Sequence, residues 1–174
     1  MYQHKREPLT EDEANRLASC CETPEEKIVV FTLLDTGLRV QEFARVAKDR
    51  IDWQAHRIVI FGKGGPYGRM SKRRVVPMSP RVKAVLEPYV SLHGGVNLGV
   101  RKVQRIVTKL ANRAGISRAA SPHVLRHTFA VMSLKKGISI TALQKILGHA
   151  NLQTTMVYLN VAPEDALREY REKW

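Results

Sequence analysis

Apolar residues follow a helical spacing over most of the chain and a strand-like spacing over one short region. Toward the N-terminus, Thr10 opens a capping box with Glu13, and Thr23 opens a second helix that Gly37 can end. We therefore expect the first 50 residues to be helical.

The pattern changes between Ile51 and Pro77. Residues 58–61 form an apolar run typical of a strand, the sequence GKGGPYG supplies turn residues, and residues 73–77 can return as a second strand. This predicts a small antiparallel sheet near residues 51–77.

Beyond this region, capping residues and glycines bound a series of expected helices. Their ranges are Ser79 to about Leu92, Val100 to Ala114, Ser121 to near Gly137, and Ser139 to near Gly148. Asn151 caps a further helix that carries Tyr158, and an amphipathic helix begins at Pro163. The pattern predicts a predominantly helical α+β fold in a single domain spanning residues 1–174.

The charge balance narrows the class of partner. The 174 residues include 29 Lys and Arg against 16 Asp and Glu, a formal net charge of +13 that favours polyanions. Cys20 and Cys21 are adjacent, so they cannot form an ordinary structural disulfide, and a reduced cytoplasmic location fits them best. No run of ~18 apolar residues indicates a membrane span.

His123 and Arg126 share one face of an expected helix, within a turn of its N-terminus. An imidazole and a guanidinium at that end can bind a phosphate, although such a pair is more often surface decoration or a satisfied helix residue. His127 lies four residues after His123, but HVLRH lacks the glutamate of a zinc-protease helix and places an arginine beside any cation. We expect no metal site, and His127 is interpreted as structural.

Two further segments carry candidate residues. Arg39 follows the helix break at Gly37, and Glu42 three residues later could hold its guanidinium, or the two could form an ordinary surface ion pair. His149 follows a glycine-terminated helix, and Tyr158 lies nine positions later. A single tyrosine is more often structural, so Tyr158 indicates catalysis only in combination with the other candidate residues.

The β region contributes a cluster of cations. Glycines flank Lys63, and a turn there could bring its ammonium group against a nucleic-acid backbone. For the other cations we prefer plain DNA-backbone contacts; they are Arg69, Lys72, Arg73 and Arg74. GKGG lacks the spacing of a phosphate-binding loop, which argues against a nucleotide hydrolase.

Five segments, in this order, resemble the tyrosine recombinases, or phage integrases. They are TGLRVQE, GKGG, HVLRH, LGHANLQTT and MVYLN, and they span most of the chain. The resemblance implies the catalytic-domain fold of that family and an active set consisting of Arg39, Lys63, His123, Arg126, His149 and Tyr158. Glu42 is then expected to support Arg39.

The resemblance also implies a reaction. Tyr158 would attack a DNA phosphate to form a covalent 3′-phosphotyrosine, without metal, ATP or other cofactor. Arg39, Arg126 and His149 would oppose the charge that develops on the phosphate oxygens. His123 would accept the tyrosine proton or orient the phosphate, and Lys63 would protonate the departing 5′-hydroxyl.

Family members usually carry an N-terminal core-binding domain that completes a clamp around double-stranded DNA. We expect this chain to lack that domain and to bind DNA weakly and in a salt-sensitive manner. Residues 163–174 are a candidate element for exchange between protomers in a homotetramer on DNA. Without DNA, packing of this helix within its own chain, and a monomer, are preferred.

Two alternatives remain open. A type IB topoisomerase uses the same nucleophile but rejoins the original strand. A non-catalytic DNA-binding module would need only the cationic surface, and the complete set of six residues argues against it.

Overall fold

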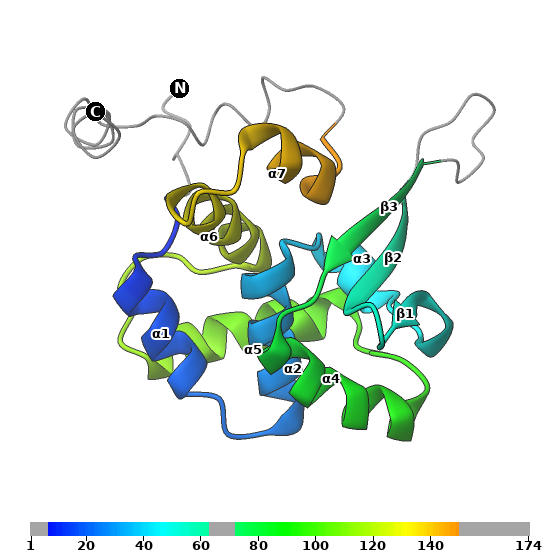
Figure 1. Ribbon diagram of the computed structural model, residues 1–174. Coiled ribbons are helices and arrows are strands. Elements are labelled where there is room, and N and C mark those ends of the chain that lie inside the picture. The colour runs from blue at the N-terminus through cyan, green and yellow to red at the C-terminus, as the bar shows by residue number, and fades with distance from the viewer. Residues whose placement is uncertain (1–6, 63–71, 150–174) are drawn as a thin grey trace, which may run out of the picture.

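The computed structural model describes residues 7–62 and 72–149. In this part of the chain, helices make up most of the structure and a small sheet lies at one side of them (Figure 1). The helices are α1 (Glu11–Ser19), α2 (Pro24–Thr36), α3 (Val40–Ala44), α4 (Pro80–His93), α5 (Val100–Arg113), α6 (Pro122–Lys135) and α7 (Ile140–Leu147), with one 3₁₀ turn, η1 (Lys48–Arg50). The strands are β1 (Ile51–Asp52), β2 (Arg57–Gly62) and β3 (Lys72–Pro77). The predicted α+β class is confirmed.

Side-chain caps explain where most helices begin. The hydroxyl groups at the N-caps of α1, α2, α4, α6 and α7 each accept a hydrogen bond from a backbone N–H in the first turn; the five residues are Thr10, Thr23, Ser79, Ser121 and Ser139. Gly37, Gly94 and Gly148 end α2, α4 and α7 in the left-handed conformation. The helix ranges predicted from these residues are confirmed for the described part.

The first 50 residues are less regular than the prediction. The chain breaks at Gly37, continues as the five-residue α3, and then forms the 3₁₀ turn η1. The positive φ of Gly37 ends α2, and Leu38 is buried immediately after it. This break matters for the site, because it places Arg39 at the start of a new helix.

Helix α2 occupies the centre of the core and packs against α4, α5 and α6. Apolar side chains cover several sides of it, with Ile28, Val29, Val30 and Leu33 fully buried. The capped N-terminus of α6 reaches this core through Val124 and Leu125.

The three strands form an antiparallel sheet in the order β1-β2-β3. Ile58, Ile60 and Val76 point toward the core, whereas Phe61 and Val75 are exposed, as period-two alternation requires. The predicted sheet near residues 51–77 is confirmed for its described strands.

Helices α6 and α7 form a second, smaller apolar cluster through Phe129, Ala130, Leu143 and Leu147. Both helices lie together above α2 and α5 in Figure 1, and α7 also contacts β3. The end of α7 is therefore fixed near both α6 and the sheet.

None of the helices within residues 7–62 and 72–149 has the length and hydropathy of a membrane span.

Candidate active site

Arg39 stands at the N-terminal boundary of α3, two residues after the break at Gly37. Glu42 accepts hydrogen bonds from both ends of Arg39: its Oε2 lies 2.8 Å from the Arg39 backbone nitrogen, and its Oε1 lies 3.1 Å from Nη1. The Arg39 side chain nevertheless remains 47% exposed. Its guanidinium is thus oriented by Glu42 and still accessible to a ligand.

Glu42 has a second cationic partner in Arg74 of β3. The two outer nitrogens of Arg74 lie 2.7 Å from the two carboxylate oxygens, a bidentate pair. Burial alone would raise the pKa of Glu42, but the hydrogen bonds and charges of Arg74 and Arg39 lower it to about 2. Glu42 is therefore ionised throughout the physiological range.

Arg126 is the buried centre of the site, with 4% of the residue exposed. Its Nη1 donates to the carbonyl of Gly37, and its Nη2 donates to the carbonyl of Leu147 at 2.9 Å. These carbonyls belong to the ends of α2 and α7, where a cation is favourable to the helix dipole. Arg126 thus joins three helices at one point.

His149 completes this group, because its Nε2 lies 3.1 Å from Nη2 of Arg126. A guanidinium can only donate, so Nε2 accepts and the proton of the neutral ring is assigned to Nδ1. Burial, followed by the charges of Arg126, Arg39 and Arg74, lowers the pKa of His149 to about 4. In the protein without ligand, His149 is neutral at pH 7.

A cavity of about 270 Å³ lies between the start of α3 and the start of α6. Arg39, Val40 and Gln41 line one side, and Pro122, His123 and Arg126 line the other. His123 is exposed near the capped N-terminus of α6, where backbone N–H groups favour anions. The cavity therefore suits a phosphate group.

The remaining predicted residues divide into two groups. Arg73 is exposed on β3, and Lys72 begins that strand, but the Lys72 side chain is outside the described part. Lys63, Arg69 and Tyr158 lie outside the described residues altogether. The structure thus brings together four of the six predicted active-site residues, Arg39, His123, Arg126 and His149.

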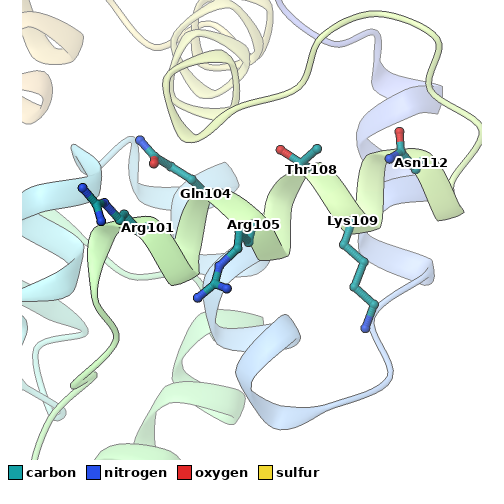
Figure 2. Close-up of a pocket in the computed structure, with 6 residues that line it drawn as sticks. All are labelled: Arg101, Gln104, Arg105, Thr108, Lys109 and Asn112. Atoms are coloured by element: carbon teal, nitrogen blue, oxygen red, sulfur yellow. The ribbon is translucent and has the colours of Figure 1, made fainter.

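A second, more open groove of about 800 Å³ follows α5 (Figure 2). The six lining side chains come from the exposed side of that helix and are Arg101, Gln104, Arg105, Thr108, Lys109 and Asn112. Val103, Val107 and Leu110 bury the opposite side in the core. Three cations among amide and hydroxyl groups make this groove suited to a polyanion with hydrogen-bonding edges.

Comparison with known proteins decides the family. The phage integrase family model matches residues 7–165, which include every segment that forms the site. The chain belongs to the phage integrase family. The four assembled residues accordingly lie in three of the five integrase segments recognised in the sequence, TGLRVQE, HVLRH and LGHANLQTT.

Curated integrase relatives are similar over most of this chain. It is 31% identical to the tyrosine recombinase XerA of Saccharolobus solfataricus over 166 residues, covering 93% of this chain and 55% of the relative. It is 29% identical to the tyrosine recombinase XerC of Listeria innocua over 160 residues, covering 85% of this chain and 53% of the relative. The chain therefore spans little more than half the length of either relative.

Solved integrase-family structures share the fold. The XerA recombinase crystal structure superposes with a TM-score of 0.80 at 29% identity, over 96% of this chain and 65% of that one. The XerH site-specific recombinase, bound to palindromic difH substrate in a post-cleavage complex, has a TM-score of 0.77 at 19% identity, over 97% of this chain and 53% of that one. At 19% identity the second similarity concerns the fold alone.

Sequence reasoning missed the partners that hold this integrase site together. It assigned Glu42 to Arg39 but did not anticipate Arg74 as the second partner, and it did not anticipate the carbonyls of Gly37 and Leu147 as acceptors for Arg126. One signal was available for Arg74: it shares the inward face of β3 with Val76, where a cation needs a buried partner.

Proposed function

We propose that this chain carries the catalytic chemistry of a tyrosine recombinase, cutting and rejoining double-stranded DNA at specific sites without metal or ATP. The observation that supports this most strongly is that four of the predicted active-site residues come together at Arg126 and the neighbouring cavity. Arg39, His123 and Arg126 line that cavity, and His149 bonds to Arg126.

Tyr158 is the proposed nucleophile. Its phenolic oxygen attacks the scissile phosphorus, so that a phosphorus–oxygen bond to tyrosine forms while the bond to the 5′ oxygen breaks. A 5′-hydroxyl then reverses the step on the same or another strand, and the bond energy is retained in the phosphotyrosine. Support for this role comes from the position of Tyr158 in MVYLN, nine residues after His149.

Arg39 and Arg126 are proposed to bind the non-bridging phosphate oxygens. Glu42 and Arg74 form a paired, neutral unit beside Arg39, which leaves the charge of Arg39 for the ligand. Burial, followed by the charges of three arginines, lowers the pKa of His149, so the ring is neutral without ligand. A bound phosphate would oppose their field and raise the pKa of His149, making it a better donor as negative charge develops.

His123 and Lys63 are proposed to move protons. His123 is exposed at the cavity, where its ring can accept the Tyr158 proton or orient the phosphate. Lys63 is proposed to protonate the 5′ oxygen as it departs. The role of Lys63 is supported by the GKGG segment and the β2–β3 connection on which it lies.

DNA contacts are proposed for two surfaces. One comprises cations of the sheet region, Arg69, Lys72 and Arg73, which would neutralise backbone phosphates. The other is the α5 groove, whose arginines can pair with phosphates while Gln104 and Asn112 can meet base edges.

Assembly is proposed to depend on DNA. The free chain is expected to be a monomer, and residues 163–174 are the proposed element for exchange between protomers of a tetramer on DNA. Sedimentation with and without a DNA duplex checks this: a tetramer without DNA would contradict it.

The experiment that tests the proposed function uses a library of nicked duplexes with random sequence around the nick. A short fragment diffuses away after cleavage and traps the covalent complex, so denaturant-resistant DNA identifies cleaved sites. Enrichment of one sequence supports site-specific recombination. Relaxation of supercoiled plasmids regardless of sequence would instead support the topoisomerase alternative, and DNA binding without adduct would support a non-catalytic module.

A further inference from the structure

Arg74 occupies an inward position on β3, where an arginine is rare unless its charge is paired. Its side chain is 11% exposed, and it lies opposite Ile60 on the face that also carries Val76. A guanidinium at such a position must find partners for its N–H groups, because an unpaired buried charge is strongly unfavourable.

The partners of Arg74 belong to two different parts of the site. Its two outer nitrogens hold the Glu42 carboxylate at 2.7 Å, and its Nε donates to the Ile146 carbonyl at 2.9 Å. The planar fork matches the carboxylate, while the third nitrogen reaches the last turn of α7. A lysine could supply the charge but not this geometry.

Glu42 connects Arg74 to Arg39. The carboxylate contacts both arginines, yet the Arg39 side chain is 47% exposed and that of Arg74 is 11% exposed. The shorter, more buried pair with Arg74 fixes the carboxylate, and the carboxylate then orients the accessible guanidinium of Arg39. With Arg74 neutralising Glu42, the charge of Arg39 remains available for a phosphate.

Arg74 also packs against the turn that precedes His149. A Cβ atom added to Gly148 would lie 2.8 Å from Cδ of Arg74 and 3.0 Å from its Nε. Gly148 has a φ of +69°, and its neighbours Leu147 and His149 are both bonded to Arg126. The Arg74 side chain therefore contacts both Glu42, which orients Arg39, and the turn that carries His149.

We propose that Arg74 is a positioning residue for strand cleavage, which holds Glu42 and the end of α7 so that Arg39 and His149 face the same phosphate. This inference rests on the proposed function for its catalytic consequence. It assigns Arg74 an internal role in place of the DNA-backbone contact expected from sequence.

The test measures the rate of covalent adduct formation at saturating trapped duplex. Arg74→Gln is expected to slow the adduct rate by on the order of 10–100-fold, by analogy with the outer-shell partners of metal ligands. Arg74→Lys, which keeps the charge, is expected to recover part of that loss. In an Arg39→Ala background, Arg74→Gln is expected to cost less than in the wild type, because the part of its action that passes through Glu42 and Arg39 is already lost, whereas the part that passes through the end of α7 remains.

Arg81→Gln is the control, since Arg81 also holds a carboxylate, that of Asp35, through two hydrogen bonds, but lies on α4 with its side chain 44% exposed. This variant should keep the wild-type adduct rate. Thermal melting of each variant identifies loss of folded protein, and Arg74→Lys provides the comparison if Arg74→Gln does not fold. A wild-type rate for Arg74→Gln, or a full additional loss in the Arg39→Ala background, would overturn the proposal.

DNA-binding affinity and an NMR signal distinguish failure of this inference from failure of the proposed function. If Arg74 were a DNA contact, Arg74→Gln would mainly weaken binding and reduce its salt dependence, which would also overturn the proposal. If the wild type forms no adduct, the proposed function fails, and the ¹⁵N NMR signal of the Arg39 Nε–H group still tests the positioning. That signal should shift in Arg74→Gln and not in Arg81→Gln; an unchanged signal would contradict the inference.

Discussion

Arg126 lies where three segments far apart in the sequence meet. Its guanidinium bonds to carbonyls that end α2 and α7 and to the ring of His149. Burial and the neighbouring charge of Arg126 lower the pKa of His149, because burial disfavours the charged ring and a second positive charge would lie beside the first. The ligand-free site therefore combines strong positive potential with a neutral histidine.

His149 gives the protein a pH dependence that can be predicted in sign. The unfolded chain protonates this histidine near its ordinary pKa of ~6.5, whereas in the folded protein the pKa is about 4. The unfolded state thus binds more protons between these values, so stability falls as the pH drops from 6.5 toward 4. His149→Gln, which can still accept from Arg126, should show a smaller fall.

Urea denaturation of both proteins at pH 7, 5.5 and 4.5 measures this difference. The other histidines and carboxylates are common to both proteins and cancel in the comparison. Parallel stability curves for the wild type and His149→Gln would show that burial beside Arg126 does not depress this pKa.

Sequence reasoning predicted which side chains come together better than how they are held. Arg39, His123, Arg126 and His149 were predicted from their motifs, and the structure gathers them. The Arg74–Glu42 pair joins residues 32 apart, and the Arg126–Gly37 bond joins residues 89 apart. Such contacts depend on tertiary packing, which no local spacing encodes.

The ends of the helices contribute directly to the candidate site, because carbonyls at the ends of α2 and α7 accept hydrogen bonds from Arg126. Gly37 ends α2 with a φ of +62°, and its carbonyl accepts from Arg126. An added Cβ at Gly37 would lie 2.3 Å from Cδ1 of Phe129, in the cluster that fixes α7 on α6. The turn at Gly37 therefore contacts both the α6–α7 cluster, through Phe129, and the candidate site, through Arg126.

Gly37→Ala and Gly94→Ala form a matched pair that tests this. Gly94 has a φ of +75° with nothing within 4 Å of an added Cβ, so alanine there should cost ~1–2 kcal/mol from backbone strain alone. Gly37→Ala should add ~1–3 kcal/mol for overlap with Phe129. Urea midpoints at constant m value measure both, and equal losses would contradict the packing at Gly37.

The local sequence was sufficient to predict where most helices begin, because capping is an interaction between residues close in the sequence. Thr10, Thr23, Ser79, Ser121 and Ser139 each bond within their own first turn, so the sequence alone predicted where those helices begin. The short α3 escaped prediction because its start depends on the backbone break at Gly37 and on Glu42 accepting from Arg39.

At the scale of the whole molecule, a net charge of +13 predicts DNA binding that weakens steeply with salt. If the α5 groove meets DNA phosphates, Arg101→Gln and Arg105→Gln together should reduce the slope of log K against log salt by about 2. Arg81→Gln, on α4, is the control for general loss of charge. Fluorescence anisotropy with one duplex at several salt concentrations measures the slope, and equal slopes for all variants would exclude these two contacts.

The proposed chemistry depends above all on one step, in which Tyr158 becomes covalently joined to DNA. Trapped complexes from the nicked-duplex library can be digested with nuclease and trypsin, and the modified peptide can be sequenced by mass spectrometry. We expect a nucleotide joined through its 3′-phosphate to Tyr158, and no adduct from Tyr158→Phe even though that variant binds DNA normally. An adduct on another residue, or one formed by Tyr158→Phe, would contradict it.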